Sequence, residues 1–190
     1  MLAAALALSS CASVSGPPPN IEDACAIFRD RPDWADAVAD SAQRWGAPAD
    51  VQLAIIWQES KFEDDARPPK RYVLGILPWG RISSAHGYSQ ALDGTWDWYR
   101  RDANNRGADR TDFRDATDFV GWYMRRSNVS NGVGMHDAYS QYLNYHEGHT
   151  GFRRGDWKTK SWLISAARRV ERKAALYRKQ LVGCGWGTMA

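Results

Sequence analysis

Residues Val51 to Phe62 read VQLAIIWQESKF, and this stretch decides how the rest of the chain must fold. It contains an unbroken apolar block from Leu53 to Trp57, preceded by Pro48 and Asp50 at positions that favour the start of a helix. A helix that is apolar on nearly every side must be covered on nearly every side by other elements. The sequence therefore predicts a helix at the centre of a domain.

Glu59 is the acidic residue near the end of this helix. It follows Ile55 and Ile56 by four and three residues, so its carboxylate projects from the same face as that apolar pair. Burial and the negative end of the helix dipole both disfavour the ionised form and raise the pKa of Glu59. A glutamic acid that stays protonated near neutral pH is the group that general-acid attack on a glycosidic oxygen requires. We predict that Glu59 is catalytic; the alternative is an exposed glutamate at a helix end.

Length and charge narrow the possible classes of protein. The chain has 190 residues, enough for one domain with a sizeable core. Its net charge is +3, with Lys and Arg spread along the chain, which argues against a nucleic-acid partner and suits an anionic cell-wall or membrane surface. Ten Trp can fill a core and also pack against sugar faces. No nucleotide-binding glycine loop is present, and we expect no cofactor.

The N-terminal segment has the pattern of a targeting signal. Met1 to Leu8 is a run of Ala and Leu, too short to span a bilayer, and Leu8-Ser9-Ser10-Cys11 resembles a bacterial lipobox. We expect residues 1–10 to be a lipoprotein signal peptide, residues 11–20 to be a lipidated Cys11 followed by a Pro- and Ser-rich tether, and residues 21–190 to form the domain. The alternative is a short apolar tail with a chance cysteine.

Two further cysteines, Cys25 and Cys184, lie at opposite ends of the predicted domain. In an oxidising compartment such a pair predicts one disulfide, whose long loop would contribute on the order of 4–5 kcal/mol. Two free buried thiols are the alternative, and the spacing disfavours a zinc site.

The remaining segments mostly show helical periodicity, which predicts a mainly α fold. Arg67 to Ser84 is the exception, because prolines and glycines interrupt it. We expect this segment to form a short β-hairpin or an ordered loop beside a substrate cleft. Asn128 to Gly134 reads as a turn-rich exit from a helix. The predicted helices are Pro32 to Trp45, Ala91 to Tyr99, Asp112 to Arg126, Asp137 to Gly148 and Trp162 to Leu181.

Three short motifs occur in a fixed order along the chain. They read Glu59-Ser60-Lys61-Phe62, Gly87-Tyr88-Ser89-Gln90 and Asn144-Tyr145-His146-Glu147-Gly148. In this order they resemble the E-S-x-F, G-L-M-Q and A-Y-N-x-G motifs of soluble-type (SLT) lytic transglycosylases, which have a goose-lysozyme-like fold. The resemblance covers roughly Trp34 to Ala175 and implies a single, mainly α, lysozyme-like domain with an insertion around Tyr72 to Ile82.

The resemblance also assigns roles to individual residues. It implies that Glu59 acts first as general acid and then as base, and that Ser60 and Gln90 contact the sugar. It places the hydroxyl of Tyr145 next to the catalytic carboxyl. His146 stands where the family has Asn, so the contact made there changes from an amide to a bulkier, titratable ring.

The reaction implied is cleavage of the β-1,4 bond between MurNAc and GlcNAc in peptidoglycan, with formation of 1,6-anhydroMurNAc ends. One acid suffices because the substrate's own N-acetyl group and 6-hydroxyl replace the second carboxylate. The expected partners are glycan strands, a membrane reached through the lipid anchor, and a cell-wall or secretion machinery. The expected location of the monomer is the periplasm, at the outer membrane.

Three other readings stay open at this point. A lysozyme-type hydrolase needs a second carboxylate in the cleft, for which the candidates are Glu63, Asp93, Asp97 and Glu147. A non-catalytic peptidoglycan-binding lipoprotein would keep the cleft without turnover. A metal site at His146, Glu147 and His149 is disfavoured, because the spacing is H-E-x-H and not the H-E-x-x-H with which two histidines on a helix bind zinc.

Overall fold

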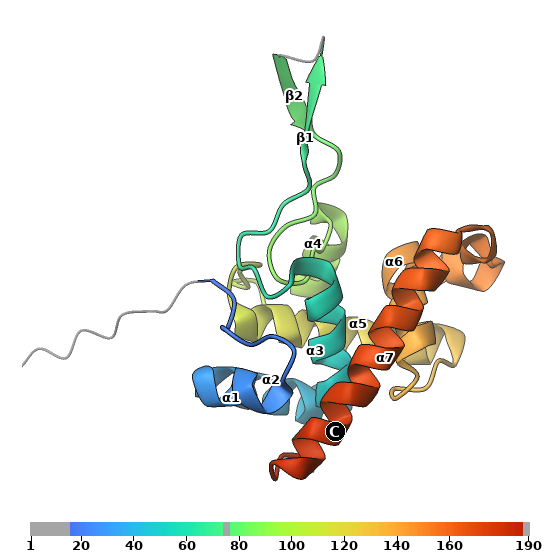
Figure 1. The fold of residues 1–190 in the computed structure, drawn as a ribbon. Coiled ribbons are helices and arrows are strands. Elements are labelled where there is room, and N and C mark those ends of the chain that lie inside the picture. Colours follow the sequence, from blue (N-terminus) through green and yellow to red (C-terminus); the bar gives the residue numbers. More distant parts are fainter. Residues whose placement is uncertain (1–15, 74–76, 188–190) are drawn as a thin grey trace, which may run out of the picture.

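The computed structural model describes residues 16–73 and 77–187, and these residues form a mainly helical domain, as predicted (Figure 1). Cys11 and the predicted signal peptide lie outside the described residues. None of the helices in the described part has the length and apolar character needed to cross a membrane. The elements are α1 (Ala24–Asp30), α2 (Pro32–Trp45), α3 (Ala49–Ser60), β1 (Lys70–Val73), β2 (Leu77–Arg81), α4 (Asp93–Asp102), α5 (Phe113–Asn131), α6 (Ala138–Arg154), the 3-10 helix η1 (Asp156–Thr159) and α7 (Ser161–Gly183).

Helix α3 is the central element, which confirms the prediction from its apolar block. All residues from Ala49 to Ile56 are buried, and α3 packs against α2, α5 and α7 (Figure 1). The helix ends at Lys61, which adopts a left-handed conformation with φ of 54°. Because the chain turns sharply there, the last turn of α3 stops at the edge of the core and presents Glu59 to a cavity.

An ion pair fixes α7 across the start of α3. Asp50 is fully buried, and the Nε of Arg178 donates to its Oδ2 at 2.8 Å. Burial raises the pKa of Asp50, and the charge and hydrogen bond of Arg178 oppose that rise. Removing one member of such a pair would leave a buried charge without compensation, so the contact helps to hold α7 against α3.

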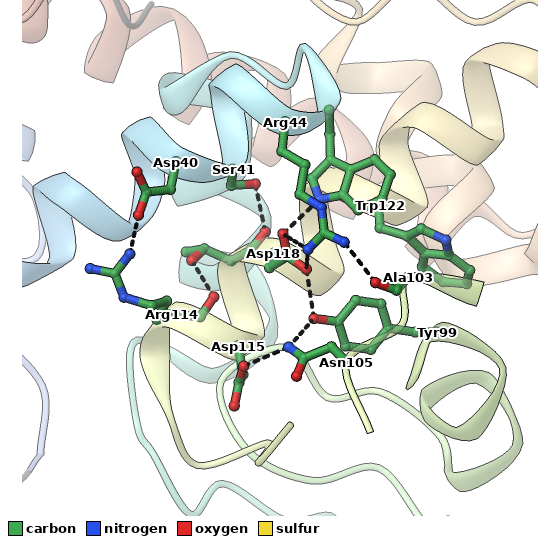
Figure 2. Close-up of polar contacts among 12 residues, drawn as sticks. Asp40, Ser41, Arg44, Tyr99, Ala103, Asn105, Arg114, Asp115, Asp118 and Trp122 are labelled. Atoms are coloured by element: carbon green, nitrogen blue, oxygen red, sulfur yellow. Dashed lines mark hydrogen bonds and ion pairs between the residues drawn. The ribbon is translucent and has the colours of Figure 1, made fainter. Parts of the chain in front are cut away.

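A polar cluster joins α2, α4 and α5 (Figure 2). The carboxylate of Asp118 accepts hydrogen bonds from Arg44 at 3.0 Å, from the indole of Trp45 at 2.7 Å and from the hydroxyl of Tyr99 at 2.7 Å. Asn105 donates to that hydroxyl and extends the cluster to the loop after α4. A carboxylate satisfied by three donors holds its helices in one arrangement, and α4 and α5 both supply residues to the cavity wall.

The predicted disulfide between Cys25 and Cys184 is present and ties α1 to the C-terminal end of α7. Helix α1 itself was not predicted, because its seven residues are too few for a periodic pattern. Its start is set by Asp23, whose carboxylate accepts from the backbone N–H groups of Cys25 and Ala26. The disulfide therefore closes the ends of the domain on each other.

The C-terminal ends of α5 and α6 differ most from the prediction. Helix α5 continues to Asn131, so the segment predicted as a turn-rich exit from Asn128 becomes non-helical only at Gly132. Helix α6 does not end at Gly148 but bends there and continues to Arg154. Gly148 has φ of 73° and ψ of 158°, a conformation that is essentially restricted to glycine. The glycine therefore marks a kink in α6 that divides it into two helical parts.

The segment between α3 and α4 contains the predicted hairpin. Strands β1 and β2 pair antiparallel, with Lys70 opposite Arg81 and Val73 opposite Leu77. Figure 1 shows the hairpin projecting away from the helices, above α3 and α4. The returning chain then forms the loop that leads to Gly87 and the start of α4.

Candidate active site

The domain has a cavity of about 450 Å³ at the C-terminal end of α3. Its walls come from elements that are far apart in the sequence: α3, the loop before α4, the first turns of α4, α5 and the centre of α6. The lining residues are Glu59, Ser83, Ala85, Gln90, Ala91, Leu92, Thr95, Phe119, Tyr123, Tyr145, His146, Glu147 and Gly148. The three motifs found in the sequence thus meet around one cavity.

Glu59 lines this cavity from the last turn of α3. Burial raises the pKa of Glu59 from 4.5 to about 7, while a hydrogen bond with Tyr142 and the charge of Lys61 act in the opposite direction. The direction of this change agrees with the prediction from the sequence, and desolvation is its main cause. At neutral pH a large fraction of the molecules therefore carries a protonated Glu59, and the same group can take a proton back in a later step.

Tyr142 is the residue that sequence reasoning missed. Its side chain hydrogen bonds with Glu59, and burial together with the negative charge of Glu59 raises the pKa of Tyr142 far above its ordinary value. The phenol therefore remains a donor, which stabilises the ionised carboxylate and fixes its direction. Tyr142 lies three residues before Tyr145 and so shares its helix face, a spacing that could have pointed to it.

Tyr145 also lies at the cavity, and its hydroxyl donates to the carbonyl oxygen of Ser89 at 2.6 Å. Burial is the main cause that raises the pKa of Tyr145, and the charge of Glu59 adds to it. Tyr145 is therefore near the acid, but its described hydrogen bond connects α6 to the loop before α4. It holds two walls of the cavity together.

Gln90 ends the loop that carries the second motif. It has φ of 50°, and its side-chain Nε2 donates to the carbonyl oxygens of Ala66 at 2.7 Å and Gly87 at 2.9 Å. Gly87 has φ of 75°, and a Cβ there would lie 2.1 Å from the carbonyl oxygen of Arg110, so no other residue fits without a shift. Gln90 lines the cavity and at the same time fixes the shape of the loop.

Ser60 and His146, the other predicted binding residues, differ in position. Ser60 is buried and is not among the residues lining the cavity; its hydroxyl donates to the carbonyl oxygen of Ile56 at 3.3 Å and accepts from the N–H of Phe62 at 3.2 Å. It thus stabilises the end of α3. His146 lines the cavity, is 38% exposed, and has its Nδ1 at 3.3 Å from Oε1 of Glu147.

Of the four acids considered as a second carboxylate, Glu147 lines the cavity, whereas Glu63, Asp93 and Asp97 do not and are exposed. Lys160 contacts both carboxylate oxygens of Glu147, at 2.8 and 2.7 Å. The third residue of the H-E-x-H segment, His149, is directed elsewhere, since its Nε2 lies 3.2 Å from the hydroxyl of Ser127 and its ring stacks on Tyr123.

A group of three acids, Glu63, Asp64 and Asp65, brings carboxylate oxygens within 4.8 Å of one another just after α3. Such a group on an exposed loop is common without an ion. The cavity residues themselves form no comparable group among the described residues.

Comparison with known proteins identifies a family for the chain. The family model described as transglycosylase SLT domain matches residues 1–184. No curated protein and no solved structure matches the chain. The matched span contains the buried α3 with its terminal acid, the Gly87 to Gln90 loop and the kinked α6. With a family match over nearly its full length, the chain belongs to the transglycosylase SLT domain family.

Proposed function

We propose that this protein is a peptidoglycan lytic transglycosylase that cleaves the β-1,4 bond between MurNAc and GlcNAc and leaves 1,6-anhydroMurNAc ends. The observation that carries the proposal is Glu59, an acid with a pKa of about 7 that lines a cavity of about 450 Å³. The family match to transglycosylase SLT domains supports the substrate class.

In the first step the protonated Glu59 donates its proton to the glycosidic oxygen. The carboxylate that remains is stabilised by the hydroxyl of Tyr142. The substrate's N-acetyl group supports the cationic centre at the anomeric carbon. In the second step Glu59 takes the proton of the substrate's 6-hydroxyl as that oxygen bonds to the anomeric carbon. The proton lost in the first step is regained, and no water is consumed.

A lysozyme-type hydrolase is the second candidate, because Glu147 brings another carboxylate to the same cavity. An ordinary glycosidase uses its second carboxylate as a nucleophile or to activate water. In this structure both oxygens of Glu147 already accept hydrogen bonds from Lys160, which favours the single-acid reaction.

The products released from purified peptidoglycan sacculi distinguish these candidates. We expect mass spectrometry to show anhydro ends with the unaltered protein and no products with Glu59→Gln. Reducing ends would instead identify a hydrolase. Sacculi that are bound but not cleaved by either protein would identify a binding protein without turnover.

We also propose that the domain acts in the periplasm of a Gram-negative bacterium, anchored to the outer membrane through Cys11. The support is the Leu8-Ser9-Ser10-Cys11 sequence, followed by a tether and by a disulfide-linked domain suited to an oxidising compartment. Fractionation of cells expressing the full chain tests this: Cys11→Ser should move the protein from the membrane to the soluble fraction. An unchanged distribution would contradict the lipid anchor.

A further inference from the structure

We propose that His146, Glu147, Lys160 and Trp162, together called the Trp162 corner, bind one N-acetylhexosamine ring of the glycan strand beside Glu59. In this proposal Glu147 binds the sugar and is not a second catalytic carboxylate. The inference rests on the proposed function, because it assigns a part of the same substrate to one wall of the same cavity.

Glu147 is a buried charge that faces a cavity. Its side chain is only 4% exposed, yet it lines the cavity together with Glu59. Oε2 accepts from Lys160 at 2.7 Å, and Oε1 accepts from Lys160 at 2.8 Å and lies 3.3 Å from Nδ1 of His146. A carboxylate has about four acceptor positions, so these contacts leave about one for a ligand. A sugar hydroxyl or the N–H of an acetamido group is a donor suited to that position.

Trp162 supplies a flat apolar surface next to these polar groups. The residue is 56% exposed, and its ring meets the ring of His146 edge to face, with centroids 4.9 Å apart and an interplanar angle of 78°. Trp162 does not itself line the cavity, but its ring lies against His146, which does. The apolar face of a pyranose ring can cover an exposed indole while its hydroxyls reach adjacent hydrogen-bonding groups.

The backbone holds the Trp162 corner in a defined geometry. The kink at Gly148 ends the first part of α6 immediately after Glu147. Lys160 precedes α7, and its carbonyl accepts from the N–H of Leu163 at 2.9 Å, so Lys160 and Trp162 belong to one ordered helix start. The ion pair between Lys160 and Glu147 then joins α7 to α6 at the edge of the cavity. A site built on two helix ends needs little rearrangement on binding.

The pairing with Lys160 also decides between the two roles open to Glu147. A general base must take a proton from the water that it activates, which here would place that proton beside an ammonium group, whereas binding a sugar needs only the one remaining acceptor position. Each oxygen of Glu147 is already engaged by an ammonium group. Replacing Glu147 should therefore weaken substrate binding and leave the chemical step largely intact.

Binding is best measured on the Glu59→Gln protein, which holds a ligand without turning it over. The probe is a soluble β-1,4-linked GlcNAc oligomer, titrated by calorimetry. Adding Trp162→Ala should raise Kd about tenfold, because the stacking contact is lost. Adding Glu147→Gln should raise it about five- to tenfold through the loss of a charged acceptor. Trp162→Tyr keeps a flat ring and should restore most of the affinity, which separates the stacking role from a folding defect.

Leu176→Ala is the matched control, because Leu176 is exposed on the same helix, α7, about 21 Å along its axis from Trp162. It should leave Kd unchanged. In the Glu59-containing protein acting on soluble glycan strands, Trp162→Ala and Glu147→Gln should raise KM and change kcat little.

The possible results separate this inference from the proposed function. If the enzyme cleaves glycan strands, but Trp162→Ala and Glu147→Gln behave like the control, the Trp162 corner is wrong and the proposed function stands. If both substitutions weaken oligomer binding, but the protein with Glu59 intact does not cleave glycan strands, the Trp162 corner stands and the proposed function is wrong. A collapse of kcat at unchanged Kd in Glu147→Gln, or the absence of oligomer binding by Glu59→Gln itself, would overturn the inference.

Discussion

Replacing Tyr142 by Phe tests how the fold sets the acidity of Glu59. Tyr142 is buried, and Phe keeps its ring, so the substitution removes the hydroxyl and little else. That hydroxyl hydrogen bonds with Glu59 and lowers the carboxyl's pKa, opposing the larger effect of burial. Without the hydroxyl, the pKa of Glu59 must rise above its present value of about 7.

The size of this effect follows from the strength of the contact. A hydrogen bond to a charged group contributes about 1.5–3 kcal/mol, and one pKa unit corresponds to about 1.4 kcal/mol, so the pKa of Glu59 should rise by about one to two. The first step needs the protonated acid, and kcat/KM therefore declines as the pH rises through the pKa of Glu59. In the Tyr142→Phe protein this decline should occur at a pH about one to two higher.

The assay is the release of soluble glycan fragments, measured as kcat/KM from acidic to alkaline pH. Tyr145→Phe is the matched control, since the hydroxyl of Tyr145 donates to the carbonyl of Ser89. Its profile should decline near the same pH as that of the unaltered protein. The reasoning is wrong if the Tyr142→Phe profile is not displaced or moves to lower pH, or if the control moves as far.

Three other substitutions test the stability of the fold. Glu59 has a folded-state pKa of about 7 against an ordinary 4.5, so the stability that it contributes at low pH is lost as the pH rises through 7. Relative to the unaltered protein, Glu59→Gln should accordingly gain about 3 kcal/mol in free energy of unfolding as the pH rises from acidic to mildly alkaline. Urea unfolding measures this, and a difference between the two proteins that stays constant with pH would contradict the burial of this acid. Replacing Cys25 and Cys184 by Ser opens the long loop and should lower the free energy of unfolding by about 4–5 kcal/mol. Thermal unfolding measures this effect, and an unchanged Tm would contradict it. Gly148→Ala should lower the free energy of unfolding by about 1–3 kcal/mol and weaken glycan binding, since alanine is strained at φ of 73° and ψ of 158°; equal stability would show that the kink is not required.

The central part of the fold could be predicted because its causes are local. The apolar block from Leu53 to Trp57 has one physical solution, a helix covered on all sides, and Glu59 follows it at a fixed helical offset. The raised pKa of Glu59 then results from burial, which the same block ensures. The disulfide between Cys25 and Cys184 could also be predicted, because a chain with so few cysteines allows few pairings.

The partners of the site residues depend on tertiary geometry and were harder to predict. Whether Tyr142 or Tyr145 reaches Glu59 depends on the rotation of α6 about its axis, which the sequence motif does not specify. The contact between Glu147 and Lys160 joins residues on either side of the bend at Gly148, where the sequence pattern indicated an end to the helix. Such contacts follow from the packing of whole elements.

The most direct test of the single-acid reaction is digestion of sacculi in heavy-oxygen water, followed by mass spectrometry of the released fragments. If Glu59 acts alone and the substrate's own hydroxyl closes the ring, the new ends carry no heavy oxygen and are lighter by one water than hydrolysis products. Heavy oxygen at the new ends would show that water is the acceptor and would contradict the account.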